Sequence, residues 1–594
     1  MNIFSQDEGI NSKSEKTRVA FVTSQLFGAA QQYRQKYDLR WYIYNSYYDG
    51  NSWVTWSKTN ARIENVYLED WRSKFSVPDV FVSHRSTKAL ILNKNPVYDV
   101  VPSKNDNQWN TQGGKLDPAT GQPIGDFAEG PMVKAAKIGG KILQHLENKL
   151  CLADKRDEAV DDALRLGNGY WKFGYDQESY DGEGDVSVTR VSPHSTYLDP
   201  NCTDSTTFEN CRYVIYVAPR DTKYIELKYG KKVEADNKDS SSSYESLYRQ
   251  QKAYISDKSN STNSTVLVYE CWVREPYAEP IPDADGEKIV KYRMRCITCT
   301  KEVLLRDAAD PLGLNEFPFE VYQINCMPGD IYADGMIKQQ KELIDQANRR
   351  LSQIADNASR MTNPRILAPR GSIIPEEFSD IPGEIVEYTL VGQQNMKPEV
   401  MQGISVASDA MMLVEFSTKR AQDAAGIHDV SRGILPPGVS SGRQLELAQA
   451  ADTMVLGPCI RDLEDFLKRS AKKILRIVKK KYPSERDVVV KGKRGVVENL
   501  KIVPEDIDFS DINVEISSFL ANTKAGRQDI IRELKDADII DGITALEYYE
   551  FPDIEAIADR VQQEKMMNNQ KPAPQGQVPG QPGQQPMPIP PIAR

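Results

Sequence analysis

The chain has 594 residues and a mass of 67.0 kDa, so it is too long for one compact core and allows roughly four domains of ordinary size. Hydrophobic residues make up 40% of the sequence and charged residues 27%, and no apolar run approaches the ~18 residues of a membrane span. The polar N-terminal sequence lacks the pattern of a signal or transit peptide, so we expect synthesis in the cytoplasm and no membrane partner.

Acidic residues outnumber basic residues by 85 to 75, which gives a formal net charge of -10. A surface with this balance does not attract nucleic acid everywhere, so any contact with DNA must be local or weak. Two basic runs stand out, at Lys472–Tyr482 and Lys491–Gly495. The first is predicted to close a helix, where lysine and arginine favour the helix dipole and face water.

The eight cysteines are sparse and irregularly spaced, which favours reduced thiols over a disulfide framework. Cys296 and Cys299 form a CxxC pair, but no second CxxC or paired histidines accompany it. Because a structural zinc ion needs four ligands, we interpret the pair as packed side chains. The sequence predicts neither a metal site nor a cofactor.

Signatures of catalysis are missing from the sequence. The glycine- and lysine-containing stretches Gly114–Gly121 and Lys137–Ile142 do not match the phosphate-binding loop of nucleotide hydrolases. The four histidines have no nucleophilic serine or cysteine in a recognisable setting. We therefore predict no catalytic residue and no enzymatic activity.

The N-terminal region begins with a helical pattern and continues into an aromatic stretch, Tyr37–Trp56. Aromatic rings can stack on single-stranded nucleic acid, but rings at mixed spacing more often pack in a core or at a subunit interface. We prefer the core or interface reading for this stretch.

Residues 130–166 are predicted to be helical, with His145 on the apolar face as a core histidine rather than a ligand. From residue 167 to about Phe319 the pattern changes to short strands, which makes this region α+β. The predicted strands are 167–176, 185–192, 211–218, 265–273, 288–298 and 317–325. The polar stretch 236–265 is predicted to be a mobile loop.

The most regular pattern in the sequence is a heptad repeat of apolar residues. Ile337, Ile344, Leu351 and Ala358 recur every seven residues, which predicts a helix of about 27 residues with one apolar seam. Asp334 is predicted to cap this helix and Pro364 to end it. A second helix is predicted over Ser405–Gly426, with Gly426 as its C-cap.

Between these two helices, residues 363–403 contain short strand patterns and three prolines that prevent helix formation. Two helices joined at one end by a small β element form a stalk, and a partner at that end is the simplest reason for it. We expect five charged residues of this element to lie near the partner surface. They are Arg365, Arg370, Glu376, Glu377 and Glu384.

The segment 427–442, IHDVSRGILPPGVSSG, is predicted to be a projecting loop, the alternative being a plain mobile connector. A helix then runs to Tyr482 from a capping box at Ser441 to Gln444, with Gly457 and Pro458 expected to kink it. Two strands and a helical region up to residue 565 follow. The Pro/Gln-rich tail, 566–594, is predicted to be disordered.

In this order, the chain resembles the portal, or head-to-tail connector, proteins of tailed bacteriophages, especially those of short-tailed phages. The stretches that carry the resemblance are YYDGNSW, ALRLGNGYWKFGYD, VSPHSTYLDP, ELIDQANRRLSQIADNASRMTNPRIL, PGEIVEY and GILPPGVSSGRQLELAQAAD. The resemblance spans nearly the whole chain, and the succession of helix, β insertion, helix, loop and kinked helix is its most specific part.

The resemblance implies an α+β portal fold with named regions. An α/β wing covers residues 1–334 and 443–520, the second part holding the long kinked helix. A two-helix stem covers 335–362 and 404–426, a small β-rich clip covers 363–403, and a tunnel loop covers 427–442. A helical crown at 521–565 precedes the disordered tail at 566–594.

The resemblance also implies a function and partners. Portal proteins form a homo-oligomeric ring, a dodecamer, at one capsid vertex of the virion, and double-stranded DNA passes along its axis. The implied partners are the terminase large subunit, the major capsid and scaffolding proteins, and the head-completion or tail adaptor proteins. The tunnel-loop residues expected in the channel are Arg432, Gly433, Ile434, Leu435, Pro436, Pro437 and Ser440.

Two other classes of function stay open at this point. A DNA-packaging enzyme is disfavoured because the phosphate-binding loop is missing. A DNA-binding structural protein of the virion is disfavoured by the acidic balance, since duplex affinity depends on cationic contacts with phosphates.

Overall fold

The computed structural model describes a large part of the chain, and every structural statement below concerns these residues alone. They are 7–57, 62–92, 95–102, 108–116, 123–128, 131–179, 182–234, 265–280, 288–362, 365–367, 399–401, 408–426, 454–482, 485–491, 497–503, 507, 511–515, 531–532 and 535. The chain divides into two compact units, the first formed by Met1–Val488 with Asn499–Phe519 and the second by Val489–Glu498 with Leu520–Arg594. The architecture described here is that of the first unit, which mixes helices and strands as the sequence predicts.

The chain begins with helices α1 (Asp7–Ile10) and α2 (Glu15–Ala20), a π-helical turn (Phe21–Leu26) and the long helix α3 (Phe27–Tyr48). The rings of α3 are inside the protein, where Tyr37, Trp41, Tyr44 and Tyr47 join one hydrophobic core. Trp41 packs edge-on against Tyr332, with ring centroids 5.6 Å apart. The core interpretation of the aromatic stretch is therefore confirmed for these rings.

Five antiparallel strands form the largest sheet, in the order β12-β11-β10-β9-β8. Their bounds are β8 Thr196–Leu198, β9 Tyr213–Asp221, β10 Thr265–Pro280, β11 Lys288–Cys299 and β12 Leu304–Ala309. Buried side chains of β9, β10 and β11 pack with the first helices, among them Ile215, Cys271 and Ile297. Strands β9, β10 and β11 follow the sequence prediction, whereas β8 and β12 were not predicted.

A three-stranded antiparallel sheet has the order β13-β6-β7, with β6 Asn168–Asp176, β7 Asp185–Val191 and β13 Phe319–Gln323. Strand β6 is almost wholly buried at its start, where Tyr170 and Trp171 are in the interior. All three strands agree with the sequence prediction.

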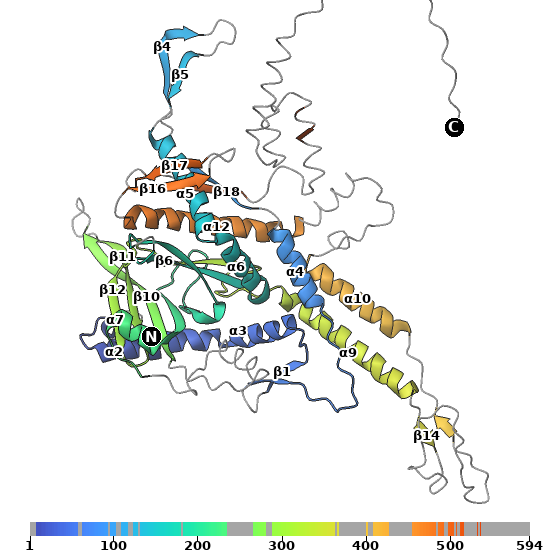
Figure 1. Cartoon of the computed structure of the whole chain (residues 1–594). Coiled ribbons are helices and arrows are strands. Elements are labelled where there is room, and N and C mark those ends of the chain that lie inside the picture. Colours follow the sequence, from blue (N-terminus) through green and yellow to red (C-terminus); the bar gives the residue numbers. More distant parts are fainter. Residues whose placement is uncertain are drawn as a thin grey trace, which may run out of the picture. The chain divides into compact units, whose positions relative to one another are not determined.

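The remaining described helices are α4 Asp79–Ile91, α5 Pro131–Lys149, α6 Leu152–Leu166, α7 Thr222–Tyr229, α9 Ile337–Thr362, α10 Ser408–Ala424 and α12 Gly457–Lys481. Helices α6 and α12 pack on the three-stranded sheet, while the other helices include α9 and α10, which project away from the sheets (Figure 1). His145 on α5 is only half-buried, so the prediction of a core position for it was too strong.

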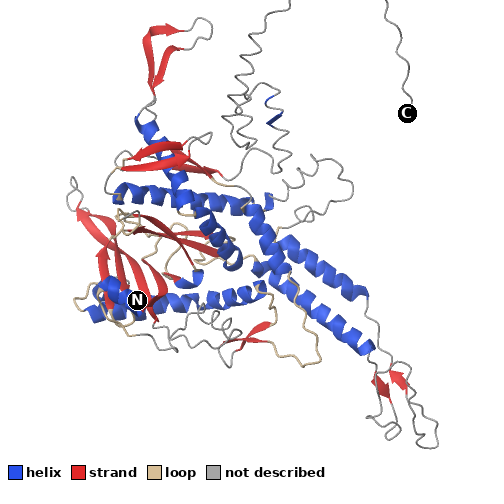
Figure 2. Ribbon diagram, in the orientation of Figure 1, coloured by secondary structure: helices blue, strands red, loops and turns tan. Residues whose placement is uncertain are grey.

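Short strands complete the described structure, as the red arrows of Figure 2 show. They are β1 Val54–Ser57, β2 Arg62–Asn65, β3 Val97–Val101, β4 Gln108–Leu116, β5 Pro123–Ala128, β14 Arg365–Leu367, β15 Glu399–Met401, β16 Arg486–Lys491, β17 Val497–Ile502 and β18 Asp511–Glu515. Strand β18 pairs antiparallel with β3, so two segments more than 400 residues apart in the sequence meet in one ladder.

The basic run at the end of α12 has a structural role. The Lys473 ammonium group is buried and donates to the carbonyl oxygens of Phe317 at 2.7 Å and Phe319 at 2.6 Å. It also pairs with Glu320 at 2.7 Å, while Lys472 pairs with Asp511 at 2.6 Å. These contacts hold α12 against the segment leading into β13 and against β18, so the run is only partly a solvent-facing helix end.

Cys296 and Cys299 lie on β11, and both thiols are buried. Burial raises the pKa of each thiol to about 12. Within the described ranges no group of three His, Cys, Asp or Glu side chains could hold a metal ion. The structure thus places the CxxC pair among packed side chains.

Candidate functional site

Helices α9 and α10 run side by side and form a two-helix unit, which we call the helical pair (Figure 1). Near the base of the pair, Ile337, Ile344 and Ala347 of α9 are buried, as are Val414 and Ala421 of α10. The buried Gln340 side chain donates from Nε2 to the carbonyl oxygen of Ala421 at 2.9 Å. The heptad seam predicted from the sequence is therefore confirmed in this half of α9.

The outer half of the helical pair leaves apolar side chains exposed. Met361 of α9 is 43% exposed, and Met412 and Phe416 of α10 are 66% and 55% exposed. Met412 and Phe416 lie one helical turn apart on α10, and adjacent exposed apolar side chains of this kind mark a surface that takes up a partner.

The start of α9 lies against the end of α6. Met336 donates its backbone N–H to the carbonyl oxygen of Leu164 at 2.9 Å. A Cβ atom at Gly335 would overlap the backbone carbonyl of Arg165, so only glycine fits this close approach. Asp334 does not take the predicted capping position, because α9 begins at Ile337, and its carboxylate pairs with Lys338 at 2.5 Å and Arg40 at 3.3 Å.

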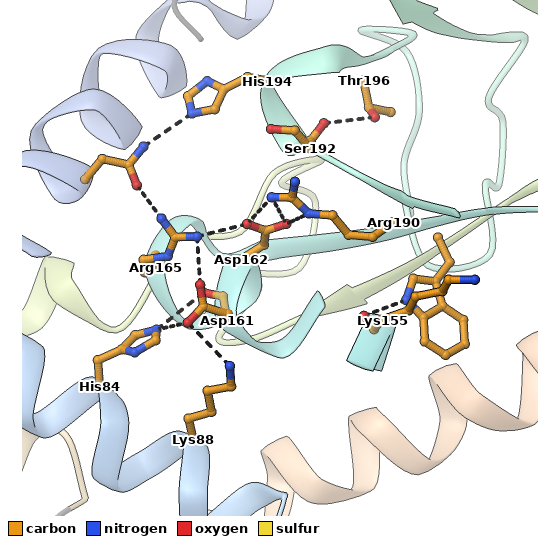
Figure 3. Close-up of polar contacts among 12 residues, drawn as sticks. His84, Lys88, Lys155, Asp161, Asp162, Arg165, Arg190, Ser192, His194 and Thr196 are labelled. Atoms are coloured by element: carbon orange, nitrogen blue, oxygen red, sulfur yellow. Dashed lines mark hydrogen bonds and ion pairs between the residues drawn. The ribbon is translucent and has the colours of Figure 1, made fainter. Parts of the chain in front are cut away.

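Helix α4 packs against both helices of the pair and against α6. The Thr87 hydroxyl lies 3.4 Å from the carbonyl oxygen of Ala425, just beyond the end of α10, and 3.6 Å from the sulfur of Met336. On the same helix, Lys88 and the buried His84 face Asp161 of α6, as Figure 3 shows. Helix α4 therefore connects the base of the helical pair to α6.

A polar network centred on α6 continues this connection (Figure 3). Asp161 lies 3.5 Å from Nε2 of His84 and 3.7 Å from the Lys88 ammonium group, and Arg165 pairs with it at 2.8 Å. Arg165 also donates to the side-chain oxygen of Asn45 on α3 at 3.0 Å. Three helices are thus joined by charged groups that are mostly removed from water.

The second acidic residue of the network, Asp162, is fully buried and faces β7. Arg190 donates to both of its carboxylate oxygens at 2.6 Å, and Arg165 donates to one at 3.2 Å. Burial raises the pKa of Asp162, while the two arginines counteract that shift. Such a buried ion pair fixes relative positions, because losing either partner leaves a charge without compensation.

Burial lowers the pKa of His84 below its ordinary value. Arg165 and Lys88 also lower this pKa, whereas Asp161 raises it. The imidazole is therefore neutral at pH 7. A second histidine, His194, lies 3.5 Å from the Asn45 amide and 3.8 Å from Asp38. Asp38 in turn pairs at 3.0 Å with the buried Arg34, which donates to the carbonyl oxygens of Pro193 and Thr196.

These contacts join α3, α4 and α6 near the base of the helical pair, and among the described residues they include no arrangement of a nucleophile, a base and an oxyanion site. The family model for the phage P22-like portal protein matches residues 128–591. The chain belongs to the P22-like phage portal protein family. No curated protein matches the chain. Members of this portal family are structural proteins rather than catalysts.

The residues predicted for the portal clip are only partly described. Arg365 lies in β14, which directly follows α9 and pairs antiparallel with β15 ahead of α10. Arg370, Glu376, Glu377 and Glu384 lie outside the described residues. The β14–β15 ladder pairs the first and last parts of the predicted clip, 363–403, with each other.

The predicted tunnel loop of the portal protein, 427–442, also lies outside the described residues, together with Arg432, Gly433, Ile434, Leu435, Pro436, Pro437 and Ser440. Gly457 and Pro458 are the first two residues of α12, and a turn at Leu456 separates them from the helical residues Met454 and Val455. The predicted crown and tail, 521–594, are outside the described ranges except for residues 531–532 and 535.

Sequence reasoning missed the residues that fix the base of the helical pair in this portal chain. His84, Asp161 and Asp162 come from segments far apart in the sequence, and no periodicity links them. A usable signal was present in α9, where the polar residues Gln340 and Asn348 stand next to the apolar seam. Both are buried, so they had to find hydrogen-bond partners. No helix within the described ranges is long and apolar enough to cross a membrane.

Proposed function

We propose that this chain forms the portal ring at one vertex of a phage capsid, through which the terminase packages double-stranded DNA and from which DNA is later ejected. The family match over residues 128–591 carries the proposal. The exposed apolar face of the outer helical pair supports it, because such a surface requires a partner and identical copies supply one.

In this proposal the regions have distinct tasks. Residues 1–334 and 443–520 form the wing, 335–362 and 404–426 the stem, and 521–565 the crown, with a disordered tail at 566–594. The polar network on α6 then serves as the joint between wing and stem, since it links α3, α4 and β7 near the base of α9. Losing one partner of the buried pair at Asp162 would leave an uncompensated charge at this joint.

The clip, residues 363–403, is the proposed docking site for the terminase large subunit and later for the head-completion or tail adaptor proteins. Support comes from its two described strands, β14 just after α9 and β15 before α10, which pair with each other. Scaffolding and major capsid proteins are the proposed partners of the ring body. The ring is proposed to be a dodecamer.

Replacing residues 368–398 with a short glycine-serine linker tests the clip, because this change keeps both strands of the ladder. The variant should still assemble into rings but should no longer retain the terminase in a pull-down assay. Shortening the loop at 281–287, which joins β10 and β11, is the matched control and should keep terminase binding. Terminase retention by the clip variant would rule out this docking site.

Assembly is the direct test of the proposed function. Mass photometry of the purified chain and electron microscopy of procapsids from co-expression with capsid and scaffolding proteins should both show rings. Particles that stay monomeric or dimeric in both settings would contradict the proposal. ATP hydrolysis by the pure protein would instead revive the packaging-enzyme alternative.

A further inference from the structure

Residues 66–78 form an extended segment, which we call the strap, that runs along α9 on the side away from α10. Backbone N–H groups of every second strap residue donate to side chains one helical turn apart: Ser73 to Asp356 at 2.7 Å, Phe75 to Ser352 at 3.1 Å and Val77 to Asn348 at 2.9 Å. The spacing of an extended chain thus matches the i, i+4, i+8 spacing of the helix.

Contacts from Ser52 and Trp53, just before β1, hold the strap on its other side. The indole N–H of Trp53 donates to the carbonyl oxygen of Phe75 at 2.8 Å, and the Ser52 and Ser76 hydroxyls lie 2.9 Å apart. The strap is therefore fixed by hydrogen bonds to α9 on one side and to Ser52 and Trp53, just before β1, on the other, including the Val66 N–H to the Trp53 carbonyl oxygen at 2.8 Å.

This well-fixed strap leaves its aromatic side chains in solvent. Tyr67 is 85% exposed, Trp71 52% and Phe75 45%. The guanidinium groups of Arg72 and Arg360 lie 5.1 Å and 5.0 Å from the centroid of the Trp71 ring, which holds the ring in place. An exposed tryptophan held between two arginines, with an exposed tyrosine and phenylalanine on the same segment, has the composition of a protein-binding hot spot.

A second exposed apolar surface lies on α10. Met412, Leu413 and Phe416 form a ridge whose members are 66%, 40% and 55% exposed. Met412 and Phe416 are four residues apart, and the 100° helical step puts them on the side of α10 opposite to the buried Val414 and Ala421. The ridge therefore faces away from α9, while the strap lies on the side of α9 away from α10 (Figure 1).

The α9 segment beside the strap and the α10 segment that carries the ridge differ in charge, while the strap itself is neutral, with Glu69 and Asp70 against Arg72 and Lys74. Residues 346–362 of α9 contain Arg349, Arg350 and Arg360 with one acidic residue, Asp356, which gives a net charge of +2. Residues 408–417 of α10 contain two acidic residues and no basic residue, which gives −2. Opposite charge on the two sides favours contact between different copies in one orientation.

We propose that the α10 ridge of one copy packs against the strap of the next copy, with the aromatic rings of the strap covering Met412 and Phe416. The proposal rests on the proposed ring. Because the two surfaces lie on opposite sides of the helical pair, the contact is heterologous and repeats from copy to copy until the ring closes. The strap then acts as an N-terminal clasp that joins neighbouring stems.

Site-directed crosslinking tests this pairing. In a background in which the exposed thiols are removed by Cys151→Ser and Cys326→Ser, the variant Trp71→Cys/Phe416→Cys is treated with a short bismaleimide. It should give a ladder of covalent multimers on a denaturing gel. Each single cysteine variant should stay monomeric on that gel, as should Leu227→Cys/Phe416→Cys, whose first cysteine is on the exposed face of α7.

A second double-cysteine variant, Lys74→Cys/Glu415→Cys, keeps the aromatic residues and tests the same contact if the first variant fails to assemble. Lys74 is in the strap and Glu415 is next to Phe416 of the ridge, and both positions are exposed. A ladder from either pair supports the contact. If the variants assemble into rings but neither gives a ladder, the proposed contact is wrong and the proposed function still stands. If the parent chain forms no rings, both proposals are wrong.

Charge reversal gives an independent reading of the same contact. Glu415→Arg should lower the fraction of chains in rings, and adding Arg360→Glu should restore it. Reversal of the exposed Glu226 on α7 is the matched control and should leave assembly unchanged. Full assembly by the Glu415→Arg variant would contradict the proposed complementarity.

Discussion

Gln340 of α9 donates its side-chain amide to the backbone carbonyl oxygen of Ala421 on α10 over 2.9 Å, and both residues are buried. The N–H of Ala425, four residues beyond Ala421, bonds to Gln422 instead. The glutamine thus takes the place of the missing helical donor near the end of α10. One polar side chain therefore joins the two helices of the helical pair at their base.

Replacing Gln340 with alanine should destabilise the protein by about 1–3 kcal/mol, because it leaves a buried carbonyl group without a donor and opens a small cavity. The change is read as a lower midpoint of thermal unfolding. Gln346→Ala, at an exposed position of the same helix, is the matched control and should leave the midpoint unchanged. Equal midpoints for both variants would show that the inter-helix bond contributes nothing.

Gly335→Ala should also lower the midpoint, since the new Cβ atom would overlap the backbone of Arg165 at the end of α6. We expect a cost of roughly 1–3 kcal/mol, the usual range for overpacking. Gly28→Ala in α3 is the control, because nothing lies within 4 Å of its added Cβ and alanine favours helix. A Gly335→Ala protein as stable as the parent would refute the close contact between α6 and the lead into α9.

Asp162→Asn removes the charge that Arg190 and Arg165 share. Because Arg190 is 30% exposed, the cost should lie near the lower end of the roughly 3–5 kcal/mol of a broken buried pair. Asp157→Asn, an exposed position on the same helix, should have little effect. A double variant with Arg190→Gln should be less destabilised than the sum of the single changes, and strict additivity would show that the two groups do not interact.

The lowered pKa of His84 should make the stability of the protein depend on pH. Burial lowers its pKa in the folded protein, so between the unfolded value near 6.5 and the lower folded value the unfolded chain binds more protons. The contribution of His84 is therefore fully present above pH 6.5 and declines as the pH falls. Thermal midpoints of the parent and of His84→Gln, measured from pH 7.5 to 5, should converge as the pH falls, and a constant difference would contradict the assignment.

Arg432 gives a prediction for the proposed channel. A loop that guides DNA in an acidic ring should hold few cations, since each neutralised phosphate adds to affinity and slows sliding. Arg432→Glu, and separately deletion of residues 434–439, should spare ring assembly and lower the amount of DNA that is packaged or retained. Arg420→Glu on α10 is the control. Full-length genomes packaged and retained by both loop variants would leave the loop as a plain connector.

The sequence alone predicted the elements whose signal is local. The seven-residue repeat from Ile337 to Ala358 gave helix α9, and alternating apolar residues gave strands such as β6 and β7. The aromatic stretch of α3 was correctly interpreted as core. In each case the spacing of apolar residues within one element shows which of its faces is buried, so residues close in the sequence are enough to predict the element.

Only the tertiary structure decided which distant segments meet. Strand β3 lacks a strong pattern of its own and becomes a strand by pairing with β18, and Asp334 bonds to Arg40 and Lys338 rather than capping α9. The strap shows the same dependence, because Asn348, Ser352 and Asp356 look like ordinary polar helix residues until the backbone of 73–77 is laid across them. These contacts stabilise the protein only after folding has brought distant groups together. The sequence shows that each buried polar group needs a hydrogen-bond partner, but it does not show which group that partner is.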